Sequence, residues 1–203
     1  MKSKLGEGYF TDDHFIFKLN EPMVCLSNAP HNSGLCKANG FFFMQVDENY
    51  SGDYKTDCRR FEDEYGLKDF VGFMTATLIK KTLTHTKIGD VEVFVTVGLK
   101  NKAIVGESNE NGWGTVNMVI LIDRGVTIGC LVNAVMTAIE AKTYTLLKLV
   151  NATGTTSDCI AVFGFEGEEE WAGTATKLGF YIGRAVRTAL EEGVRRWFSL
   201  KTF

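Results

Sequence analysis

Short apolar runs separated by polar turn residues make up most of the first half of the chain. Runs of this length that are rich in aromatic or β-branched residues are typical of strands. The strands predicted in this way span residues 15–17, 23–26, 41–44, 71–74 and 91–97. Residues 57–65 carry charged side chains at helical spacing and stop before Gly66, a residue type that commonly ends helices.

The second half of the chain contains two long amphipathic patterns. The continuous apolar run 116–122 predicts a buried strand, followed by a turn at 123–125. Thr127 suits the N-cap of a helix that reaches about residue 148, and a second long helix is predicted from near Thr174 to about Phe198. A strand over 160–163 separates the two helices. This order predicts an α+β fold, a single layered domain over residues 1–203 with a mixed or antiparallel sheet and two long helices in its C-terminal half.

Composition narrows the function classes. The 203 residues are 45% hydrophobic and 23% charged, with a net charge of −3, so no basic surface for nucleic acid or an anionic membrane is expected. No apolar run reaches the roughly 18 residues of a membrane span. Five cysteines without paired spacing, and no recognisable signal peptide, predict reduced thiols in the cytoplasm.

A loop rich in hydroxyl groups stands between the first long helix and the strand at 160–163. Residues 151–159 contain four hydroxyl side chains, Gly154 and Asp158. Such residues favour turns, and they offer many short donors and acceptors near the ends of two regular elements, as small-molecule sites often do. Capping of the helix end would require the same residue types, so both interpretations stay open.

Three further polar clusters flank predicted elements. Asn133, Thr137 and Glu140 share one face of the first long helix, where a plain solvent-facing stripe would look the same. Residues 173–179 place a Gly-Thr pair and a lysine at a helix N-terminus, which suits either an anionic group or simple N-capping. Residues 27–35 form a turn-rich segment that suits either a plain loop or, through its two amide side chains, recognition of amide groups.

Familiar catalytic motifs are absent. The three histidines are far apart and lack metal-ligand spacing, so no metal site is predicted. The chain contains no P-loop, no HExxH and no GxSxG, and its glycines form no dinucleotide-binding fingerprint.

Taken in order, the polar clusters and the segments beside them resemble the adenosylcobinamide amidohydrolase family. The resemblance extends from Leu26 to about Val186, and it depends on the order and spacing of several short motifs. The motifs are LSNAPHNSGL at 26–35, VGFMTA at 71–76, VTVGL at 95–99, GTVN at 114–117 with Asp123, LVNA at 131–134, EAKT at 140–143, ATGT at 152–155 with Asp158, and AGTATKLG at 172–179. The chain departs from the family pattern at His31, Ser33 and the pair Thr156–Ser157.

The resemblance implies an enzyme of corrinoid salvage. The enzyme would hydrolyse the amide that joins a propionate arm of the corrin ring to the aminopropanol linker of adenosylcobinamide, giving adenosylcobyric acid. The corrinoid is then the substrate, and no cofactor is identified. A non-catalytic corrinoid-binding protein is the alternative. The aromatic tail residues Trp197, Phe198 and Phe203 suggest a contact between subunits of a homo-oligomer.

Amide hydrolysis needs a base, stabilisation of an oxyanion and an acid for the leaving nitrogen. The catalytic candidates are Asp158, Glu140 and Asp123 as bases, Lys142 or Lys177 to stabilise negative charge, and Thr153, Thr155 and the backbone near Gly154 as oxyanion donors. A covalent route with Thr153, Thr155 or Ser157 as nucleophile is the second option. The substrate-binding candidates are Ser27, Asn28, Asn32, Gly34, Asn117, Asn133, Gly154, Thr156, Ser157, Gly173, Thr176 and Lys177. We expect all of these residues to converge on a single pocket.

Overall fold

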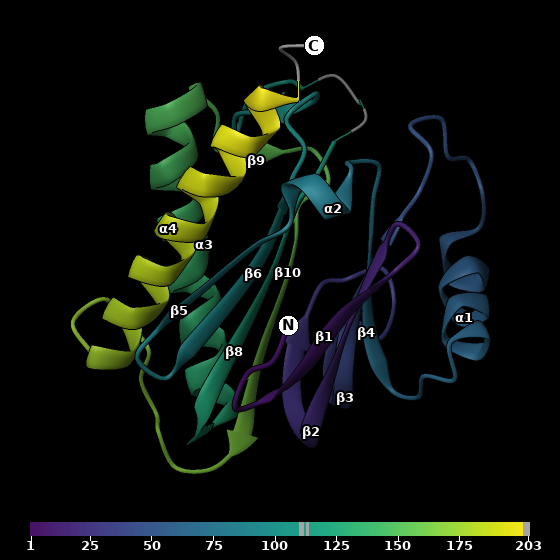
Figure 1. Ribbon diagram of the computed structural model, residues 1–203. Coiled ribbons are helices and arrows are strands. Elements are labelled where there is room, and N and C mark those ends of the chain that lie inside the picture. Colours follow the sequence, from purple (N-terminus) through teal and green to yellow (C-terminus); the bar gives the residue numbers. More distant parts are fainter. Residues whose placement is uncertain (110–111, 113, 201–203) are drawn as a thin grey trace.

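Ten strands and four helices form the part of the chain that the computed structural model describes, residues 1–109, 112 and 114–200 (Figure 1). The strands are β1 (Gly6–Thr11), β2 (His14–Ser27), β3 (Gly34–Gln45), β4 (Phe70–Thr75), β5 (Thr84–Ile88), β6 (Val91–Val97), β7 (Lys102–Ala103), β8 (Val116–Val126), β9 (Gly154–Thr155) and β10 (Cys159–Glu166). The helices are α1 (Tyr54–Glu64), α2 (Ile79–Thr82), α3 (Ile128–Val150) and α4 (Lys177–Ser199).

Eight of the strands form one mixed sheet in the order β4-β3-β2-β10-β8-β6-β5, with β1 paired to β2. The pairs β3–β4 and β8–β10 are parallel, and the other pairs in the sheet are antiparallel. The register of β2 against β3 shifts between Lys18 and Met23, at a bulge that contains Pro22. On its other edge β2 therefore pairs with β1 before the bulge and with β10 after it.

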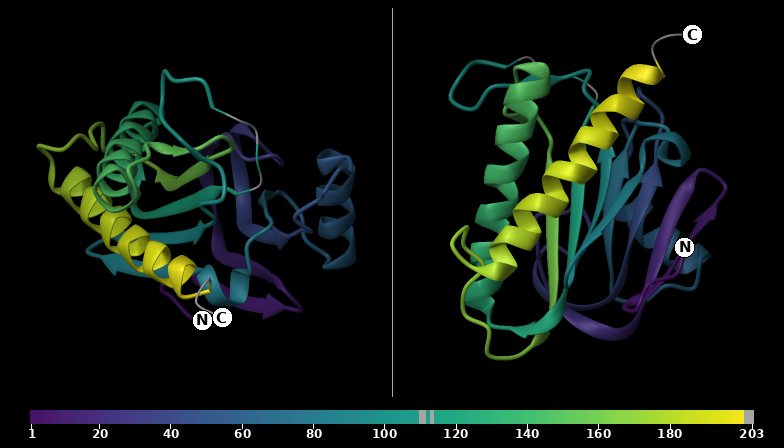
Figure 2. Two further views of the ribbon diagram at one scale, coloured as in Figure 1. Left: turned by 90° about the horizontal axis from the view of Figure 1, so that it is seen from above. Right: turned by 60° about the vertical axis from the view of Figure 1, so that its left-hand side comes forward.

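The sheet curls around a core of phenylalanine rings. Strands β3 and β6 are four positions apart in the sheet, which would separate them by about 19 Å if the sheet were flat. Yet the rings of Phe41 and Phe94 lie 5.1 Å apart between centroids, and Phe17 lies 5.0 Å from Phe94. The two halves of the sheet therefore face each other across this aromatic core. The view from above shows the course of the curled sheet (Figure 2).

Helices cover both outer faces of the curled sheet (Figure 1). The long helices α3 and α4 lie side by side on the half formed by β10, β8, β6 and β5, where Val93, Ile120 and Leu131 belong to one apolar core. On the opposite side α1 packs against β3 and β4, with the Phe61 ring 4.6 Å from that of Phe42. Among the described residues no helix is long and apolar enough to cross a membrane.

The edge hairpin β5–β6 buries one charged side chain. Glu92 is only 1% exposed, and its carboxylate accepts hydrogen bonds from Lys87 at 2.8 Å and from His85 at 3.0 Å. Burial alone would raise the pKa of Glu92, but these two partners outweigh it and bring the pKa below its ordinary value.

The expected fold class is confirmed: the structure is α+β, with a mixed sheet and two long helices in the second half. The Thr127 side chain caps α3 as predicted, by accepting a hydrogen bond from Cys130 N. Helix α4 begins later than predicted because Thr176, rather than Thr174, accepts from Gly179 N. The predicted turn at 123–125 is wrong, since β8 continues through it to Val126 in parallel with β10.

The tail residues expected at a subunit contact lie in different environments. Trp197 is only 8% exposed and belongs to the core beneath α4, whereas Phe198 is 48% exposed. Phe203 lies outside the described residues.

Candidate active site

A buried ion pair lies directly behind the hydroxyl-rich loop. The Lys142 ammonium, on the inward face of α3, contacts Oδ2 of Asp158, the residue that precedes β10. Oδ2 also accepts a hydrogen bond from Thr155 N at 3.1 Å, and Oδ1 accepts from Val116 N at 3.0 Å and from the Thr155 hydroxyl. The two charged side chains are 8% and 14% exposed. The Asp158 carboxylate therefore has four donors around it, one of them a full positive charge.

The close approach of this pair explains the glycine in the loop. A Cβ atom on Gly154 would overlap Asp158 Oδ2 and lie 2.8 Å from Lys142 Nζ. Only a residue without a side chain lets the backbone pass this close to two charged groups. A buried ammonium without a carboxylate beside it would be very costly, so the glycine and the ion pair depend on each other.

Side-chain amides attach neighbouring segments to the hydroxyl-rich loop. The Asn28 side chain accepts from Ile160 N at 2.7 Å and donates to Asp158 O at 3.2 Å, which fixes the loop after β2 to the start of β10. Asn117 is 1% exposed and donates to Met74 O at 3.0 Å, which fixes the start of β8 to the end of β4.

The remaining hydroxyls of the loop have separate partners. Thr153 accepts from Val105 N at 2.8 Å, beside the short pairing of β7 with β9. The exposed Thr156 accepts from Asn101 Nδ2 at 2.6 Å, and Ser157 donates to Gly114 O at 3.1 Å.

A cavity of about 340 Å³ opens at this end of the sheet. Its wall comes from the segments that follow β2, β3 and β4, from the segment before β8, and from the hydroxyl-rich loop. The lining residues are Pro30, Val46, Tyr50, Met74, Thr75, Ala76, Gly112, Gly114, Thr115, Ser157 and Cys159. Three of the motifs that carry the family resemblance, those at 26–35, 71–76 and 114–117, thus meet at one cavity. The hydroxyl-rich loop contributes Ser157 and Cys159, whereas Thr155 and Asp158 are not among the residues that line it.

The loop after β2 is held by an internal hydrogen bond and by contacts with β4 and α1. Ser27 Oγ accepts from Ala29 N at 2.9 Å, and Asn32 donates to Phe70 O at 2.6 Å from a left-handed backbone conformation. Gly34 also has a positive φ, of 87°, and begins β3. His31 lies 2.9 Å from the Glu62 carboxylate, so it links this loop to α1.

A second group of predicted residues lies at the other end of the molecule. Asn133 accepts from Ala172 N at 3.2 Å, close to Gly173, while Thr176 caps α4 and the Lys177 ammonium lies over the Tyr181 ring. Asn133 and the end of α3 at Val150 are 17 residues apart, which is about 26 Å along a helix. This group binds the start of α4 to α3 and does not reach the cavity.

Two of the three predicted bases also lie away from the cavity. Asp123 is six residues from Asn117 along β8, or about 20 Å, and its carboxylate pairs with Lys4 at 2.7 Å. Glu140 is exposed on the outer face of α3, because a residue two positions before Lys142 lies on the opposite side of the helix. The first group of residues is therefore gathered at one end of the sheet, but of the predicted site residues only Ser157 lies in the cavity wall. The second group lies elsewhere, so the single pocket expected from the sequence is not formed, and the roles of all these residues stay predictions.

Sequence reasoning missed two ionisable residues in the cavity wall. Tyr50 donates to the Asp57 carboxylate at 2.5 Å, and its pKa is raised by burial and by that hydrogen bond. Burial raises the pKa of Cys159 to about 11, so this thiol is a poor nucleophile at neutral pH. Tyr50 follows β3 in a segment with no motif signal, whereas Cys159 follows Asp158 directly. Among the described residues no group of three or more His, Cys, Asp or Glu side chains could hold a metal ion.

Comparison with known proteins gives two matches. A protein of Methanocaldococcus jannaschii that is described only as uncharacterized is 32% identical over 98 residues. The match covers 43% of this chain and 38% of that protein, so the chain spans well under half of that relative's length. The family model for adenosylcobinamide amidohydrolase matches residues 2–202, nearly the whole sequence. The chain therefore belongs to the adenosylcobinamide amidohydrolase family.

Proposed function

We propose that the chain hydrolyses the amide between the corrin propionate and the aminopropanol linker of adenosylcobinamide. The products are adenosylcobyric acid and aminopropanol, and the reaction serves corrinoid salvage. Family membership supports the activity. The cavity of about 340 Å³ supports the mode of binding, because a pocket at the small end of the usual range suits a side arm while the macrocycle stays outside.

The proposed mechanism depends on two contacts of the Asp158 carboxylate, one with Thr155 and one with Lys142. The Thr155 hydroxyl donates to the Asp158 carboxylate, and the Lys142 ammonium contacts the same carboxylate. A nucleophile bonded to a base, with a third group that orients the base, is the arrangement that activates a hydroxyl. All three residues belong to the motifs that resemble the family.

In the proposed reaction Thr155 Oγ attacks the amide carbon as its proton passes to Asp158. Collapse of the tetrahedral intermediate breaks the C–N bond, and the same proton passes to the leaving nitrogen of aminopropanol. Water then attacks the acyl-threonine ester, releases the carboxylic acid and restores the hydroxyl. Ser157 and Thr115 line the cavity, and their hydroxyls donate to Gly114 O and Ser157 O. To stabilise the oxyanion in either step, these hydroxyls would turn from those acceptors to the carbonyl oxygen.

The activity is tested by incubating the purified chain with adenosylcobinamide and following the products by liquid chromatography and mass spectrometry. We expect adenosylcobyric acid and aminopropanol in equal amounts. Binding of the corrinoid without any product would contradict the proposal and favour the non-catalytic corrinoid-binding alternative. If the chain neither binds nor cleaves adenosylcobinamide, this corrinoid is excluded both as its substrate and as its ligand.

The site is tested with Asp158→Asn and Thr155→Val, and Thr188→Val is the control, because Thr188 is an exposed threonine on α4 outside the candidate site. Loss of a base or nucleophile lowers turnover by about 10²-fold or more, whereas the control should stay within a few-fold of the unmodified chain. If Asp158→Asn loses activity and Thr155→Val keeps it, the nucleophile is a water molecule. Near-normal turnover in both variants would show that this network is not the catalytic centre.

A further inference from the structure

The outward face of α3 is unusually apolar for a helix in an outer layer. Val132, Met136 and Tyr144 lie along this face, with 47%, 54% and 53% of their surface exposed. Only two exposed charged residues, Glu140 and Lys148, occur in the 23 residues of the helix. A helix at the surface of a monomer normally has a polar outer face, and a contiguous exposed apolar patch marks an interaction surface.

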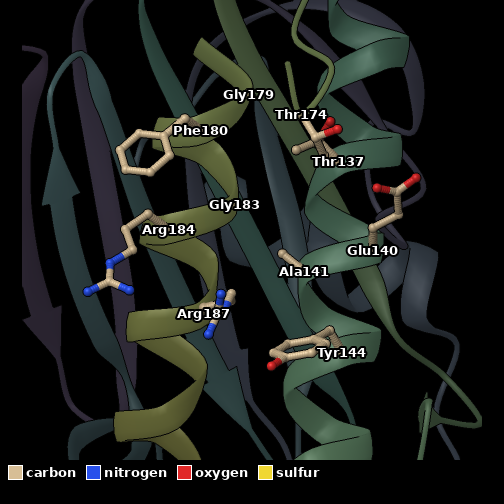
Figure 3. Close-up of a pocket in the computed structure, with 10 residues that line it drawn as sticks. All are labelled: Thr137, Glu140, Ala141, Tyr144, Thr174, Gly179, Phe180, Gly183, Arg184 and Arg187. Carbon is tan, nitrogen blue, oxygen red and sulfur yellow. The ribbon is translucent and has the colours of Figure 1, made fainter. Parts of the chain in front are cut away.

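A groove between α3 and α4 continues this apolar face. The groove has a volume of about 310 Å³, and Ala141 and Gly183 lie in its middle, with Phe180 at its edge (Figure 3). A Cβ atom on Gly183 would meet nothing within 4 Å. Glycine inside a helix costs about 1 kcal/mol relative to alanine, and here no close packing within the chain requires it. The open groove floor leaves room for a side chain that enters from outside the chain.

Opposite charges flank the groove. Glu140 projects from α3 on one side and Arg184 from α4 on the other, at about the same height in the view of Figure 3. Neither side chain has an ion pair with any residue in the described part of the chain. One turn before each of them stands an exposed apolar residue, Met136 on α3 and Phe180 on α4.

We propose that this face binds a second copy of the chain, with the two-fold axis running along the groove. A rotation of 180° about that axis places the α3 side of one copy opposite the α4 side of the other. The rotation causes no shift along the groove. Arg184 of each copy then lies opposite Glu140 of the other, and Phe180 lies opposite Met136. An axis across the helices would instead place Arg184 against Arg184. The pairing of Glu140 with Arg184 therefore favours one of the two symmetric arrangements, as expected of a self-complementary two-fold interface. Arg187 is the other charged residue in the groove, and its guanidinium lies over the Tyr144 ring of the same copy.

The proposal does not depend on the hydrolase activity, because the face is separate from the cavity beside Ser157.

A second copy explains the exposed side chains better than a small molecule does. A small molecule in the groove would leave Val132 and Met136 in contact with water, whereas a second copy covers them. The experiment therefore measures the oligomeric state of the full chain alone, by sedimentation and by light scattering after size exclusion.

We expect the unmodified chain to have twice the mass of its 203 residues at micromolar concentration. Arg184→Glu and Glu140→Arg should each weaken the dimer at least tenfold, because each creates two like-charge contacts. The double variant, Arg184→Glu with Glu140→Arg, should regain the dimer. Arg59→Glu on α1 is the matched control, because Arg59 is an exposed arginine on the far side of the sheet.

Three results would overturn the proposal. The unmodified chain could be monomeric at these concentrations. A dimer that Arg184→Glu leaves unchanged would use another face. Failure of the double variant to regain the dimer, with its circular dichroism and thermal unfolding unchanged, would exclude the proposed arrangement of the charges.

Discussion

Replacement of Lys142 by methionine tests the structural basis of the candidate site. Lys142 is 6% exposed, and its ammonium contacts a carboxylate that is itself 14% exposed. Methionine keeps most of the length and apolar surface of the side chain while removing the charge. The Asp158 carboxylate would retain its other three donors, Val116 N and the backbone and hydroxyl of Thr155, but no counter-charge.

The size of the effect follows from burial of an uncompensated charge. Breaking a buried ion pair by removing one partner costs about 3–5 kcal/mol. Because three donors stay in place, we expect the lower end, about 3 kcal/mol of the free energy of unfolding. For a chain of this length that corresponds to a fall in Tm of about 6–12 °C. Urea titration followed by circular dichroism measures the free energy, and calorimetry measures Tm.

Lys148→Met is the control, because Lys148 is an exposed lysine on the same helix and its loss should cost about 0.5 kcal/mol or less. In the variant that combines Lys142→Met with Asp158→Asn no charge is left unpaired. Its cost should therefore be smaller than the sum of the two single costs. A loss below 1 kcal/mol for Lys142→Met, or strict additivity in the double variant, would refute the argument that the pair is a buried and coupled unit.

Three further results are expected. Gly154→Ala should destabilise the fold, as measured by urea titration, because its Cβ overlaps the Asp158 carboxylate. Glu92→Gln should lower the unfolding free energy at pH 7. Since the pKa of Glu92 is depressed on folding, that deficit should shrink as the pH falls below the ordinary value of 4.5; a deficit independent of pH would contradict this. Iodoacetamide should modify Cys36 before any other cysteine at pH 7, as peptide mass mapping would show, because hydrogen bonding with Cys25 lowers its pKa to about 7.

Features determined by nearby residues were predictable from the sequence. The cap of α3 at Thr127 depends on a contact three residues away, and the apolar spacing that follows fixes the inward face of the helix. The strand at 91–97 was predicted with its full bounds, because its apolar residues and Gly98 mark both the strand and its end. The family motifs also predicted the meeting of the loop after β2 with the hydroxyl-rich loop.

Long-range pairing could not be predicted in the same way. Two short apolar runs, 15–17 and 23–26, are a single strand, because β3 pairs with both of them across the bulge at Pro22. The predicted single pocket failed because family motifs record which residues belong together in a fold, without saying which of them share a site. Glu140 and Lys142 occupy one motif, yet only Lys142 turns inward to Asp158.

The position of β10 in the sheet has a consequence for synthesis of the protein. It pairs with β2 on one side, as at Ala161 with Ser27, and with β8 on the other. A ribosome adding residues in order makes β1 to β8 first, so one edge of β2 and one edge of β8 stay open until β10 emerges. Unpaired strand edges attract other chains, and this interval is when the nascent protein is most exposed to aggregation. Truncation before β10 should therefore give an insoluble product even though most of the sheet has already been made.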